Sequence, residues 1–129
     1  MDEISVTIPG ERSFGAVAGL VLGGVAARHD LTLDVLDDLH LALESLLDRD
    51  AEDGELTIVF RVGPETIEAS VGPFERRAIS ELDSEAGEQL EQLDLRRLLD
   101  TVVDGFSVSE RDGGSWVELR KRHDLAGRR

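Results

Sequence analysis

Several chemistries are excluded by what this 129-residue chain lacks. It contains no cysteine. Without cysteine there can be no disulfide, no thiolate metal site and no cysteine nucleophile. The composition fits a reducing compartment, and the length fits one domain with a core of its own.

Long apolar runs are also absent. The longest, AVAGLVLGGVAA over residues 16–27, has 12 residues, whereas a membrane-spanning helix needs about 20. The first residues, MDEISVTIPGERSF, are acidic and alternating, which is unlike a signal peptide. We therefore expect a cytoplasmic protein that does not insert into a membrane.

Basic residues are scarce. The chain has 14 of them against 28 acidic residues, giving a formal net charge of −14, and Lys121 is the single lysine. Such a field repels nucleic-acid backbones and anionic lipid. We expect neither nucleic acid nor membrane surfaces as partners.

The spacing of apolar residues predicts the order of the elements. Alternation indicates strands and three- to four-residue spacing indicates helices. Strands are predicted at 3–8, 55–62, 65–71, 106–110 and 115–121, and helices at 14–28, 33–49 and 93–104. Thr32 is a candidate cap for the second helix, and residues 72–92 are predicted to form a loop with at most a helical turn.

The first predicted helix should bury one side, made of Phe14, Val17, Leu20, Val21 and Val25. It also contains glycines that lower helix propensity, each by about 1 kcal/mol relative to alanine. Their presence indicates a close approach to the sheet or to another helix.

The order β-α-α-β-β-loop-α-β-β predicts a two-layer α/β sandwich. In it, a mixed, mainly antiparallel sheet is covered on one face by two or three helices. We expect a single domain over residues 3–121, followed by a frayed tail at 122–129.

This order, with a leucine-rich second helix that ends in acidic residues, resembles the histidine-kinase-type ATPase fold. Within it, the chain looks like the anti-sigma-factor serine kinases of bacterial partner-switching systems. In that family the second helix carries a Glu-Ala-x-x-Asn box, in which Glu assists as a base and Asn holds magnesium. The counterpart here is ESLLD at 44–48. The resemblance thus makes Glu44 a weak or relic base and places Asp48 at the magnesium position.

The family's second motif, Asp-x-Gly-x-Gly, binds adenine through its Asp. Aligned on Gly72, this chain reads SVGPF over 70–74. Ser70 replaces the acceptor carboxylate and Phe74 replaces the second glycine, so this resemblance implies weakened adenine recognition.

The third motif, a Gly-x-Gly-Leu turn, cradles phosphates on backbone N–H groups. Its counterpart here is QLDL at 92–95. Both glycines are missing, and Asp94 places a negative charge where phosphate would lie. Together the three departures imply lost or impaired ATP binding, so we expect no cofactor. The alternative is an active kinase that binds ATP and magnesium through Glu44 and Asp48.

Other readings of these residues remain open. Asp37, Leu41, Glu44 and Asp48 share one stripe of the second helix, which is either a solvated face, a relic pocket edge or a partner-binding surface. His40 and Glu44 have a spacing that metal ligands use, but His29 and His123 are distant in sequence, so we expect no metal site.

A hydrolase is a further alternative, with Ser70, Ser80 or Ser84 as nucleophile and His29 as base. The chain has no Gly-x-Ser-x-Gly motif to support it. Trp116 on an alternating strand favours a core position.

The resemblance implies a regulator of transcription that acts by protein–protein binding. Its expected partners are a sigma factor or an anti-sigma-factor antagonist, and its acidic charge suits a basic partner surface. Because the family often dimerises, a homodimer through the first strand and first helix is also expected. A stand-alone ligand-binding or structural domain is the third alternative.

Overall fold

The computed structural model describes residues 2–9, 15–47, 54–79, 82, 90–111 and 113–123. All the predicted strands and helices are present within one or a few residues of their expected bounds. In chain order the elements are β1 (Asp2–Pro9), α1 (Gly15–His29), α2 (Leu33–Leu47), β2 (Glu55–Val62), β3 (Thr66–Phe74), the 3₁₀ turn η2 (Arg76–Ile79), α4 (Leu90–Val102), β4 (Gly105–Arg111) and β5 (Gly114–Arg122).

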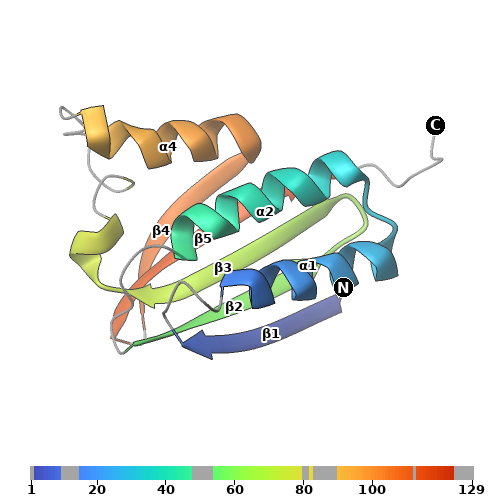
Figure 1. Ribbon diagram of the computed structural model, residues 1–129, viewed down its shortest axis with the longest axis horizontal. Coiled ribbons are helices and arrows are strands. Elements are labelled where there is room, and N and C mark those ends of the chain that lie inside the picture. Colours follow the sequence, from blue (N-terminus) through green and yellow to red (C-terminus); the bar gives the residue numbers. More distant parts are fainter. Residues whose placement is uncertain are drawn as a thin grey trace.

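The five strands form one sheet in the order β1-β2-β3-β5-β4. Each of the four pairings is antiparallel. The helices α1, α2 and α4 lie against one face of this sheet (Figure 1). The predicted two-layer α/β sandwich is therefore confirmed, and the described strands contain no parallel pair. We call the uncovered side of the sheet the open face.

The core lies between the helices and the sheet because apolar residues alternate along each strand. In β2 the residues Leu56, Ile58, Phe60 and Val62 are buried, whereas their neighbours are partly or fully exposed. Helix α2 adds one buried face, formed by Val35, Leu39, Ala42, Leu43, Leu46 and Leu47. Helix α2 contacts both α1 and α4, so it is the central helix of its layer.

Helix α1 differs from its prediction in one respect. Leu20 was expected inside but is 78% exposed, whereas Ala18, Leu22 and Val25 are buried. The helix is apolar on nearly every side, so its spacing could not select the buried face. The predicted close approach occurs at Gly19, where an added Cβ would lie 2.9 Å from Nε2 of His40 on α2.

Two predicted boundaries are corrected. The segment expected to be a loop from residue 72 continues as strand to Phe74 and then forms the turn η2. The expected tail from residue 122 is wrong for its first two residues: Arg122 ends β5, and His123 is buried with its Nε2 3.1 Å from the Gly63 carbonyl oxygen. Within the described part of the chain, every helix is too short or too polar to traverse a bilayer.

Candidate functional site

Helix α2 carries the first predicted site residue, Glu44. The helix begins after Thr32, whose Oγ1 accepts a hydrogen bond from the Val35 N–H at 3.3 Å, as the predicted cap requires. Because the opposite face is buried against the sheet, Glu44 points away from the sheet, and its side chain is 63% exposed. Its described neighbour is His40, with Nε2 3.9 Å from Oε2 of Glu44.

The rest of the predicted motif on α2 is less informative. Asp48, at the expected magnesium position, lies outside the described residues. The described residues contain no group of three or more His, Asp or Glu side chains that could hold a metal ion. Serines 80 and 84, considered as nucleophiles, also lie outside the described residues.

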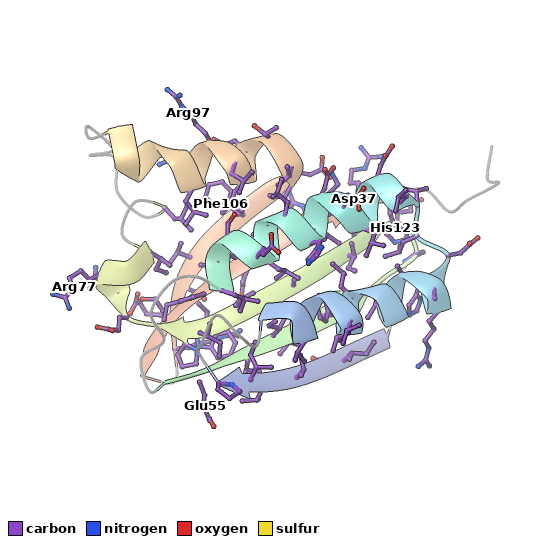
Figure 2. All side chains as sticks on the ribbon, in the orientation of Figure 1. Asp37, Glu55, Arg77, Arg97, Phe106 and His123 are labelled. Atoms are coloured by element: carbon purple, nitrogen blue, oxygen red, sulfur yellow. The ribbon has the colours of Figure 1, made fainter. Side chains whose placement is uncertain are left out.

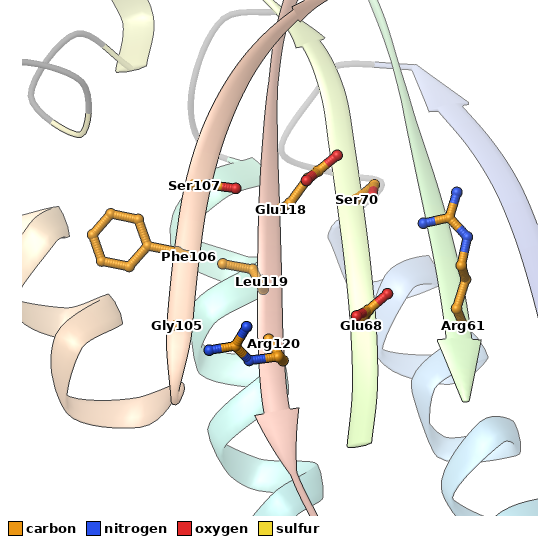
Figure 3. Close-up of a pocket in the computed structure, with 9 residues that line it drawn as sticks. All are labelled: Arg61, Glu68, Ser70, Gly105, Phe106, Ser107, Glu118, Leu119 and Arg120. Atoms are coloured by element: carbon orange, nitrogen blue, oxygen red, sulfur yellow. The ribbon is translucent and has the colours of Figure 1, made fainter. Parts of the chain in front are cut away.

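Ser70 lies on the other side of the sheet from Glu44. It pairs with Val59 on β2 and Glu118 on β5, and its side chain is buried on the open face. Figure 3 looks onto that face, with the helices behind the sheet. The structure therefore does not bring Ser70 and Glu44 together. The sequence already indicated that Ser70 lies on the side of the sheet away from the core, because it is out of phase with the core residues Ala69 and Val71.

Gly72 is required by packing. A Cβ at this position would lie 2.7 Å from the Trp116 ring and 2.9 Å from the Ser115 carbonyl oxygen. Trp116 is buried, as predicted, but on the open face, where the Arg111 guanidinium carbon lies 4.5 Å from its ring centroid. The glycine thus lets β3 approach the indole.

Asp94 lies within α4, which begins at Leu90. Residues 92–95, aligned with the phosphate-binding turn, are therefore helical. In an α-helix only the first four N–H groups lack an intrahelical acceptor. Those of Asp94 and Leu95 come after these four, so they are not free to bind phosphate. Phe74, aligned with a motif glycine, is fully buried in the core.

The exposed surface of the helical layer contains large apolar side chains. Leu33 is 67% exposed and Leu41 44% exposed on α2, and Leu20 of α1 is also exposed. Leu33, Asp37, Leu41 and Glu44 are spaced by four, four and three residues, so they form one stripe along α2 (Asp37 is labelled in Figure 2). The sequence identified this stripe from Asp37 onward but missed Leu33, which immediately follows the cap.

A polar cluster that the sequence did not predict lies at the start of α2. Lys121 Nζ donates to Asp38 Oδ2 at 2.9 Å and to the Val102 carbonyl oxygen at 2.8 Å, so β5 is tied to α2 and α4. Asp104 Oδ2 accepts from the Arg122 N–H at 2.6 Å. A pocket of about 450 Å³ opens beside these groups. The partners come from distant segments, so no local motif signals them.

Comparisons with known proteins give a likeness in structure alone. No protein-family model matches the chain, and no curated protein matches it. A crystal structure of the RsbU and RsbW domains of Rv1364c from Mycobacterium tuberculosis is similar, with a TM-score of 0.70 at 12% identity. The match covers 99% of this chain and 34% of that chain, so this chain spans about a third of its length. The likeness confirms the predicted fold class.

Proposed function

We propose that the protein is a regulatory protein-binding module, similar to anti-sigma factors, in which ATP binding is lost or impaired. Its partner would be a sigma factor or an anti-sigma-factor antagonist. The fold supports this proposal through its likeness to a structure that contains an RsbW domain. The motif resemblance described above points to the same class, although fold alone does not determine function.

The observation that carries the proposal is the exposed stripe of α2. A helix face that only meets water is normally polar, but this one alternates Leu33 and Leu41 with Asp37 and Glu44. Protein interfaces combine apolar contact residues with polar residues around them. The acidic members would favour a basic partner, because complementary charge steers encounter and selects partners.

The geometry of the motif positions supports the loss or impairment of ATP binding. Glu44 and Ser70 lie on opposite sides of the sheet, so one nucleotide could not contact both. Gly72 packs closely against the Trp116 ring. The counterpart of the phosphate-binding turn is part of α4.

Titration calorimetry with ATP and magnesium tests the nucleotide part. We expect no binding heat at millimolar ATP. Micromolar affinity would contradict the proposal and favour the kinase alternative. In that case Glu44→Gln should abolish phosphate transfer to a protein substrate but leave the affinity for ATP nearly unchanged.

Affinity capture from the host lysate, with identification by mass spectrometry, tests the partner. We expect a sigma factor or an antagonist protein in the wild-type sample and a strong loss with Asp37→Arg. The matched control is Asp100→Arg, the same charge change at an exposed position of α4. Absence of both partner classes would contradict the proposed function. Equal loss with the two variants would contradict the α2 stripe as the binding surface.

A further inference from the structure

The open face of the sheet carries a row of alternating charges. Register pairs join Glu3 of β1 to Arg61 of β2, Arg61 to Glu68 of β3, and Glu68 to Arg120 of β5. The row thus crosses four adjacent strands with the signs minus, plus, minus, plus. Adjacent strands are about 4.8 Å apart, so the four positions span about 14 Å. We call these four residues the charged row.

The side chains of the row remain accessible to a second molecule. Arg61 Nε lies 3.3 Å from Glu3 Oε2, and both side chains are substantially exposed. Arg120 is exposed and lies over β4, where a Cβ on Gly105 would be 2.8 Å from its Nη2. Gly105 therefore leaves room for the guanidinium along the surface. Arg61, Glu68 and Arg120 border a hollow of about 210 Å³ (Figure 3).

The open face is balanced in charge although the chain is not. Alternation along the described strands places four glutamates and four arginines there, namely Glu3, Glu55, Glu68, Glu118, Arg61, Arg111, Arg120 and Arg122. The whole chain has a net charge of −14. Two copies approaching through other surfaces would therefore meet more repulsion than two copies approaching through this face.

The order of signs fits a second copy in one orientation. A two-fold axis parallel to the strands, between β2 and β3, reverses the row. Glu3 then faces Arg120 of the second copy, and Arg61 faces Glu68 of the second copy. A two-fold axis along the row would instead place each charge against itself. The row is thus self-complementary in the way that a two-fold interface requires.

We propose that the open face is a homodimer interface, with the two sheets packed face to face about this axis. This interface goes beyond the proposed function and does not depend on it. It also differs from the dimer through the first strand and helix that the resemblance implied.

The size of the face makes this a weak dimer. About this axis four strands of each copy overlap, because β4 lies beyond β1 of the second copy. At the usual spacing and about seven residues long, these strands offer roughly 450 Å² on each copy. The total of about 900 Å² is below the usual range of stable interfaces and fits a weak, transient one. The hollow beside Arg61 and Arg120 leaves room for the long side chains of the opposite copy to interdigitate. We expect dissociation in the micromolar range.

Sedimentation equilibrium of the full chain, from about 1 to 500 μM, tests the proposal. Arg61→Glu places glutamate against Glu68 of the second copy twice in each dimer, and Glu68→Arg places arginine against arginine twice. Each variant alone should weaken self-association by about tenfold or more. Circular dichroism verifies that both variants keep the fold.

Mixing the two variants gives the decisive measurement. In a mixed dimer every facing pair is again opposite in sign. Position 61 of one chain, made acidic, faces position 68 of the other, made basic, and the unchanged Arg61 faces the unchanged Glu68. Association should therefore return to about the wild-type level. Changes inside each chain cannot produce this rescue, because each variant is impaired by itself.

The control separates the charged row from net charge. Arg97→Glu and Asp100→Arg change the charge by the same amounts at exposed positions of α4. Each should associate like wild type, and mixing them should add nothing. A wild-type protein that is monomeric at 500 μM, or a mixture of Arg61→Glu and Glu68→Arg no tighter than either alone, would overturn the proposal. Dimers that ignore both row variants would place the interface elsewhere and would also overturn it.

Discussion

The two faces of the sheet use the same strands in different ways. On the covered face, β2 contributes Phe60 to a closed apolar core. On the open face, its neighbours Val59 and Arg61 are only partly buried. Successive side chains point to opposite faces, so two adjacent residues of one strand show how the two faces differ. The covered face stabilises the fold, whereas the open face is available to bind another molecule.

The division has one exception near the β4–β5 hairpin. There the open face also buries residues: Trp116 and Gly72 pack together beneath Arg111. The open face is therefore closely packed at this end and charged at the other. The variants below test how sharply the two faces, and the two ends of the open face, differ.

The largest effect is expected at neighbouring positions of β2. Phe60→Ala removes a fully buried ring and should lower the free energy of unfolding by about 3–5 kcal/mol. Val59→Ala, on the open face, should cost about 1 kcal/mol or less, because less surface leaves water there. Urea unfolding followed by circular dichroism measures both. Similar losses at the two positions in dilute, monomeric protein would mean that Val59 is packed as closely as Phe60.

A second contrast concerns two glycines. Gly72→Ala forces a Cβ against Trp116 and the Ser115 carbonyl oxygen, so it should cost about 1–3 kcal/mol. Gly23→Ala in α1 meets nothing within 4 Å and should instead stabilise the protein by about 0.5–1 kcal/mol. Thermal unfolding gives both signs. A neutral Gly72→Ala would show that the indole can move and that this end of the open face is loosely packed.

Neighbours on β5 provide the third contrast. Lys121 bonds Asp38 and the Val102 carbonyl oxygen on the covered side, whereas Arg120 lies exposed on the open face. Lys121→Met should cost about 1–2 kcal/mol, because two acceptors lose their donor. Arg120→Met should cost at most about 0.5 kcal/mol. Equal costs in chemical denaturation would mean that the Lys121 contacts add no net stability.

The sequence predicted the fold well because the fold depends on local periodicity. Alternation in β2 predicted the observed strand over 55–62, and the leucines of α2 predicted its buried face. The prediction failed where periodicity carried no information. In α1 almost every residue is apolar, so Leu20 was assigned to the wrong side.

The candidate site was predicted less completely than the fold. Glu44 could be placed on an exposed stripe because its helix is amphipathic. Alternation already indicated the side of the sheet on which Ser70 lies, whereas the approach of Gly72 to Trp116 depended on strand register. Likewise, the charged row exists only because β3 pairs with β5, a contact between residues about 50 positions apart. No local sequence pattern predicts that β3 pairs with β5.

The smallest effect is expected at the closely packed end of the open face. Arg111 lies over Trp116, the single tryptophan of the chain, so Arg111→Ala should expose the indole and shift its fluorescence to longer wavelength. The loss of stability should be only about 0.5–1 kcal/mol, since the cation–π contact is near the surface. Arg120→Ala, on the same face but at the charged end, should leave the emission unchanged. If both variants shifted the spectrum equally, the two ends of the open face would be coupled, and the distinction between a packed end and a charged end would fail.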